Sequence, residues 1–208
     1  VRLDEKCKVK YDIVDIPIGL KATDRFIMSL SHHTGLDVPD EINDERGRLL
    51  DMVADNSKYL YGKRVALFGD PDTLVPLVEF LLSLDMKPVY VITGSESKYF
   101  DEEMARMLKV IPEAKYMSGE MADTFRLHQW IKQEGVDMIM GNTYAKYIAR
   151  DEDIPLIRIG FPIADRPGHN YFPITGYAGA TNLVIKILNA FLDEQDRTCD
   201  EEKVEFQM

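Results

Sequence analysis

The sequence predicts an α/β protein built on a doubly wound parallel sheet, preceded by a helical N-terminal segment. Three observations support this prediction. From residue 64 onward, short apolar runs alternate with amphipathic helical stretches. The runs are rich in aliphatic side chains, which is typical of strands that are buried on both faces. Most of the runs also end in glycine, where the chain turns from a strand toward the next helix.

The N-terminal part of the chain is expected to contain one strand and two helices. Residues 9–20 (VKYDIVDIPIGL) alternate in the manner of a strand that stops at a proline and a glycine. Thr23 is then expected to cap a helix over residues 24–31. A longer helix is expected from Pro39 to Gly62, because apolar residues recur at helical spacing and glycine is typical just beyond a helix end.

The remaining elements are expected to alternate along the chain. The expected strands cover residues 64–69, 88–94, 114–119, 136–141 and 154–160. The expected helices cover residues 72–84, 99–111, 124–134, 143–149 and 177–195. This order divides the chain into a strand and helices leading into the domain (1–62), a Rossmann-like α/β domain (63–195) and an acidic C-terminal tail (196–208).

Composition and charge exclude several classes of function. The formal net charge of -11 argues against wholesale nucleic-acid binding, because a polyanion needs a basic surface. It leaves open the docking of a partner that carries a local positive patch. We find no apolar run of transmembrane length and no signal peptide, so we expect no membrane partner and a cytoplasmic location. The first residue is Val1, as expected of a processed chain or of a piece cut from a longer one.

The two cysteines argue against a metal cluster held by this chain alone. Cys7 and Cys199 lie near opposite ends of the sequence and form no CxxC motif. A reducing compartment fits this sparse use of cysteine.

The turn GDPDT, after the strand expected at 64–69, lies where some α/β proteins cradle a phosphate. It has one glycine instead of the three of a dinucleotide fingerprint, and two carboxylates would repel the phosphates. We therefore expect no nucleotide here. Asp70 or Asp72 is expected to cap the next helix, with Pro71 in its first turn.

Asp51 and Asp55 are the first candidate metal ligands. Their i, i+4 spacing places both carboxylates on one face of a helix, about one turn apart, where two oxygens can contact a hard cation. On the pattern alone, a solvated face or ion pairs with Arg46, Arg48 or Lys58 is the favoured reading.

The stretch GFPIADRPGHNYFPITGYAGA (160–180) concentrates prolines, glycines and aromatic residues after the last expected strand. The carboxyl ends of strands are where α/β sheets place their ligand sites. A binding surface and a packed structural loop or subunit interface are equally good interpretations of this stretch.

Four further stretches carry a family resemblance. They are ERGRLLDMVADNSKYLYGKRVALFGDPD, LHQWIK, GNTYAKYIARDEDIPLIRIGFPIADR and TGYAGATNLV. Together they resemble the C-terminal part of the β subunit of nitrogenase component one, from about Ile16 onward. The stretches IPIGLKATDRF, LYGKRVALFGDPD and DRPGHNYFPITGY look closer to the vanadium type. In the last of them, only His169 stands where the molybdenum type has a histidine-rich run. The resemblance leaves the heterometal open and favours vanadium.

The resemblance implies an enzyme that reduces dinitrogen to ammonia with electrons from an ATP-hydrolysing iron protein. Its partners would be the nitrogenase α subunit, a second β subunit and the iron protein. The eight-iron P-cluster is bridged in that family by cysteines of the α subunit and of the N-terminal part of the β subunit. The iron-molybdenum or iron-vanadium cofactor lies in the α subunit. This portion would thus supply subunit interface and docking surface, hold neither cluster and be inactive in isolation.

The resemblance also implies roles for three residues. Asp51 and Asp55 match two aspartates of a divalent-cation site between two β subunits, whose other ligands come from the second β subunit. Lys98, in GSESKYF, matches a lysine that contacts the iron protein. Two other hypotheses remain: a related scaffold on which the cofactor is assembled, and a free-standing α/β module that binds a ligand with residues 160–180.

Overall fold

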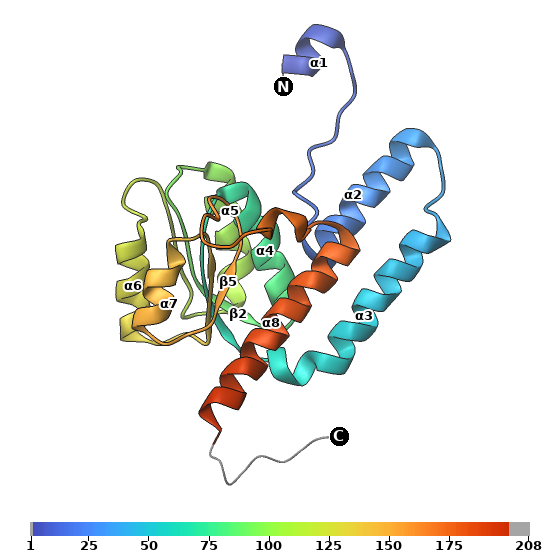
Figure 1. Ribbon diagram of the computed structural model, residues 1–208. Coiled ribbons are helices and arrows are strands. Elements are labelled where there is room, and N and C mark those ends of the chain that lie inside the picture. The colour runs from blue at the N-terminus through green and yellow to red at the C-terminus, as the bar shows by residue number, and fades with distance from the viewer. Residues whose placement is uncertain (1, 200–208) are drawn as a thin grey trace.

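The structure, a computed structural model, describes residues 2–199 and contains one five-stranded parallel sheet (Figure 1). The strand order is β3-β2-β1-β4-β5. The strands are β1 (Arg64–Phe68), β2 (Lys87–Thr93), β3 (Lys115–Ser118), β4 (Met138–Gly141) and β5 (Leu156–Arg158). The chain moves outward from β1 to β3, then crosses to the other side of β1 and continues outward to β5. This is the order of a doubly wound sheet, and the predicted fold class is confirmed.

Helices cover both faces of the sheet. Those of the α/β part are α4 (Pro71–Ser83), α5 (Lys98–Met107), α6 (Thr124–Gln133), α7 (Ala145–Asp151) and α8 (Gly176–Thr198). Figure 1 shows α6 and α7 on one side of the sheet and α4 and α8 on the other. The central strand β1 is sealed between these layers, with Val65, Ala66 and Leu67 fully buried. No helix of the described residues is both long and apolar enough to cross a membrane.

The N-terminal segment differs from its prediction. Helix α1 (Arg2–Cys7) is followed by residues 8–18, which form no strand. Alternation alone is not enough for a strand, because the segment does not pair with the sheet, and Ile13 is 82% exposed. Helix α2 (Gly19–Thr34) begins earlier than predicted. Thr23 lies inside it and donates a hydrogen bond to the Gly19 carbonyl at 2.6 Å, so the predicted cap at Thr23 is wrong.

The other boundaries lie within a few residues of those predicted. The long helix is α3 (Asp40–Leu60), and the helix predicted to reach residue 111 ends in a short 3-10 turn, η1 (Leu108–Val110). Pro71 occupies the first turn of α4 as expected, and Asp70 stands at the N-cap position, where its side chain forms no capping hydrogen bond. Helix α8 continues into the predicted tail, and residues 200–208 lie outside the described residues. The division into three segments stays a prediction.

A three-residue network ties α2 and α3 to α8. Arg46 donates hydrogen bonds to both carboxylate oxygens of Asp24, at 2.9 and 3.0 Å, and the Tyr177 hydroxyl donates to Asp24 at 2.6 Å. Burial opposes ionisation of Asp24, but the bonds from Arg46 and Tyr177 outweigh it and lower its pKa. Burial, reinforced by Asp24, raises the pKa of Tyr177 to about 12. The network thus fixes the orientation of α3, which carries both candidate metal ligands.

Candidate functional site

The loop after β5 folds across the carboxyl end of β4. Strand β4 lies beside β1, and the strand order reverses its direction between these two strands. Asn142 donates a side-chain hydrogen bond to the Phe161 carbonyl at 3.1 Å. The Thr143 hydroxyl donates to Asp165 at 3.0 Å and accepts from the Ala164 amide at 2.7 Å. The polar side chains that follow β4 are therefore engaged within the protein.

An ion pair fixes the same loop to β5. Arg158 donates from Nε and Nη2 to the two oxygens of Asp165, at 3.0 and 2.8 Å. Both side chains are largely buried. The bonds from Arg158 hold the pKa of the Asp165 carboxyl far below its usual value, against the opposing effect of burial, and Thr143 adds to the shift. Asp165 is thus ionised over the whole physiological range.

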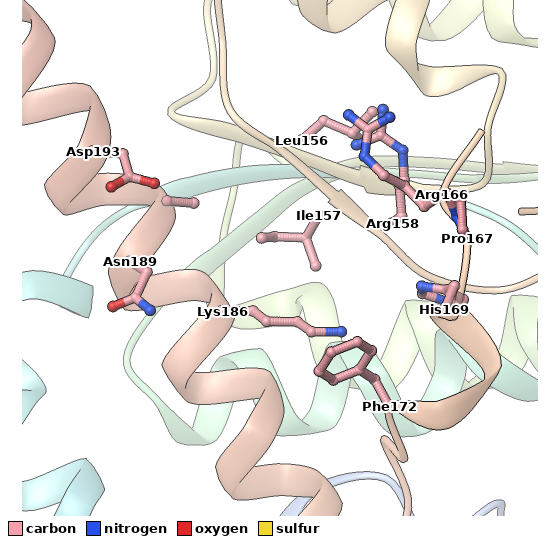
Figure 2. A pocket seen from close by; sticks show the side chains of 11 residues that line it. Leu156, Ile157, Arg158, Arg166, Pro167, His169, Phe172, Lys186, Asn189 and Asp193 are labelled. Atoms are coloured by element: carbon pink, nitrogen blue, oxygen red, sulfur yellow. The ribbon is translucent and has the colours of Figure 1, made fainter.

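A pocket of about 370 Å³ opens between β5, the loop and α8 (Figure 2). Arg158, Arg166, His169 and Lys186 line one end, and Asp193 lines the other. His169 belongs to a short 3-10 turn, η2 (His169–Tyr171). The stretch 160–180 therefore contributes one wall of a pocket.

Like Arg158, Lys186 is a residue of this pocket that the sequence reasoning missed. It comes from the middle of α8, and its ammonium lies over the Phe172 ring, 4.5 Å from the ring centroid. A usable signal was present, because Lys186 interrupts the apolar run LVIKIL on an otherwise core-facing helix.

Asp51 and Asp55 project from α3, and both are exposed. Neither carboxylate forms an ion pair with Arg46, Arg48 or Lys58 within the described part of the chain. Arg46 pairs with Asp24 instead. The described residues also contain no group of three or more His, Cys, Asp or Glu side chains placed to hold a metal ion. Because hard cations take six or more oxygen ligands, these two carboxylates need further ligands from elsewhere.

Lys98 is the first residue of α5, immediately beyond the loop that follows β2. Its side chain is 90% exposed and forms only a 3.5 Å ion pair with Glu102 in the described structure. Helix α5 packs on β3 and α4, whereas α3 packs on α8, so the structure does not bring Lys98 together with the two aspartates.

Fold and surface together define a doubly wound α/β domain on which the candidate residues Asp51, Asp55 and Lys98 are all exposed. The chain belongs to the nitrogenase component 1 type oxidoreductase family, whose model matches residues 1–192.

Named relatives and solved structures agree with this assignment. The chain is 48% identical over 206 residues to the nitrogenase molybdenum-iron protein beta chain of Clostridium pasteurianum, covering 98% of this chain and 44% of the relative. The corresponding beta chain of Methanococcus maripaludis is 38% identical over 200 residues, which cover 95% of this chain and 43% of the relative. A chain of nitrogenase Cp1 at pH 6.5 matches with a TM-score of 0.95 and 49% identity, over 98% of this chain and 44% of that chain.

These matches confirm the resemblance to a nitrogenase component-one β subunit. They also show that the chain spans less than half the length of these relatives. The relatives named here are molybdenum-iron beta chains, so the closeness to the vanadium type stays a prediction.

Proposed function

We propose that the chain is the C-terminal portion of a nitrogenase β subunit, within the enzyme that reduces dinitrogen to ammonia with electrons from an ATP-hydrolysing iron protein. The observation that carries this proposal is the 48% identity to a nitrogenase molybdenum-iron beta chain across 98% of the chain. The match in fold, with a TM-score of 0.95, extends over the same span. A cytoplasmic location is part of the proposal.

Within that enzyme, this portion supplies contact surface rather than cluster ligands. The described residues do not fit a cluster, because they include no group of three metal-ligating side chains. The family resemblance implies that the eight-iron P-cluster and the iron-molybdenum or iron-vanadium cofactor are held by the α subunit and by other parts of the β subunit. Exposed apolar side chains on α2 and α3, among them Met28, Leu30 and Leu50, support contact with the α subunit or a second β subunit.

The proposal is tested on the natural chain co-expressed with its α subunit. Elemental analysis of the purified complex counts iron and sulfide and identifies molybdenum or vanadium. Acetylene reduction is then assayed with the iron protein and ATP. We expect an iron-rich complex that contains a heterometal and reduces acetylene only with ATP. A cluster-bearing but inactive complex would indicate the assembly scaffold instead, and a complex without iron would refute both.

Lys98 is proposed to steer the iron protein toward its docking surface. An exposed ammonium on an acidic chain contributes mainly to the rate of association, through long-range attraction. Lys98→Glu is expected to lower the second-order rate of electron delivery by roughly tenfold at low salt, with a smaller effect at high salt. Stopped-flow kinetics measures this rate.

The matched control for this rate is Lys132→Glu, at an exposed lysine in the last turn of α6. It makes the same charge reversal on a different helix. Equal rates for the two variants at every salt concentration would show that Lys98 has no special part in docking.

A further inference from the structure

The pocket beside β5 carries more positive than negative charge at one end. Three cationic side chains line this end: Arg158, Arg166 and Lys186. The carboxylate that the structure places among them is Asp165, and Arg158 occupies it with two hydrogen bonds at 3.0 and 2.8 Å. Arg166 reaches the same carboxylate at 3.6 Å. Asp165 is thus the ion-pair partner of both guanidinium groups, those of Arg158 and Arg166.

Lys186 adds a further positive charge that is not paired. No carboxylate of residues 5–199 lies within ion-pair distance of its ammonium, which lies over the Phe172 ring. Asp193 follows Lys186 by two helical turns, about 10 Å along the axis of α8, and it faces the opposite end of the pocket (Figure 2).

Partial burial makes this excess charge costly. Burial lowers the pKa of Lys186. Burial, followed by the charges of Lys186 and Arg158, lowers the pKa of His169, and Asp165 opposes this effect only in part. A negative group between these side chains would stabilise their charged forms.

The rest of the lining suits the body of a small organic molecule. Leu156, Ile157 and Ala190 supply apolar surface to the lining, and Asn189 supplies an amide. The volume of about 370 Å³ is near the lower end of the range of small-molecule sites.

We propose that this pocket binds a small organic oxyanion, whose carboxylate or phosphate group is held by Lys186, Arg166 and His169. The apolar surface of β5 and α8 contacts the rest of the ligand. The site is separate from the nitrogenase assignment, and its test does not depend on activity.

The test is calorimetric titration of the full chain, in the complex that contains it, with succinate and with inorganic phosphate at constant ionic strength. Chloride is the reference anion. We expect both probes to bind more tightly than chloride. Lys186→Met is expected to weaken their binding at least tenfold. The control Lys132→Met, which removes the same charge from an exposed position on α6, is expected to leave it unchanged.

A second variant keeps the test independent of packing around Lys186. Arg166→Gln alters a side chain that is 57% exposed, so it is expected to fold normally and to weaken both probes. Succinate binding that persists while phosphate binding is absent would identify the ligand as a carboxylate, and the reverse would identify a phosphate. Equal binding by the wild type, Lys186→Met and Arg166→Gln would overturn the proposal. The proposal would also be overturned if neither probe bound the wild type and Lys186→Met made the complex less stable. That result would show that a carboxylate of another chain fills the pocket.

Discussion

Gly179→Ala is expected to destabilise the chain strongly, because α8 and the loop before it have no room for a methyl group. An added Cβ at this position would lie 3.0 Å from the Cα and 3.1 Å from the carbonyl oxygen of Ile174, and closer still to its carbonyl carbon. These are backbone atoms, so no side-chain rotation relieves the clash. We expect a loss of about 3 kcal/mol in the free energy of unfolding. The melting temperature, followed by circular dichroism, should fall by roughly 10 °C.

Gly47→Ala is the matched control for this prediction. Gly47 lies inside α3, and an added Cβ there would meet no atom within 4 Å. Alanine restricts the unfolded chain and favours the helix, so this variant should be more stable than the wild type by about 0.5–1 kcal/mol. Equal melting temperatures for Gly179→Ala and the wild type would contradict the close packing of α8 on Ile174.

The family resemblance implies a divalent-cation site between two β subunits, and the double change Asp51→Asn and Asp55→Asn is expected to abolish cation binding there. The two exposed carboxylates lie one turn apart on α3 and are left unused by ion pairs within the described residues. Asparagine keeps the size of each side chain but removes the charge that a hard cation requires. Elemental analysis of the assembled enzyme after equilibrium dialysis should show a bound divalent cation in the wild type and its loss in the double variant.

The same helix offers a control with identical spacing. Asp40 and Asp44 are also exposed and also lie four residues apart, about three turns nearer the start of α3. Changing this pair to asparagine should leave the cation content unaltered. Equal cation loss from both double variants would indicate nonspecific attraction to an acidic helix, and retention in both would refute the proposed ligands.

The parallel sheet could be predicted because its strands are encoded locally. The runs VALF and VYVI are continuous apolar segments, and such segments form strands only where both faces are covered. Residues 9–20 show the limit of this reasoning. Their alternation resembles that of a strand, but a strand also needs a neighbour to pair with, and pairing is a property of the whole fold.

The candidate sites also differ in how far the sequence alone predicts them. Asp51 and Asp55 could be found from the sequence because helical spacing alone places them on one face. The pocket beside β5 could not be predicted from the sequence, because its lining comes from β5, the following loop and the middle of α8. Arg158 and Lys186 are far apart in the sequence, and only the packing of α8 beside β5 brings them to one pocket.

The two outermost strands of the sheet limit how copies of the chain can associate. β3 has four residues and β5 has three, so each free edge offers few backbone groups to a strand of another molecule. Short edges of this kind oppose the growth of a continuous sheet from one copy to the next. Association is therefore directed to side-chain surfaces such as α2 and α3, where Met28 and Leu50 are exposed. The geometry of the sheet thereby favours discrete assemblies over fibres.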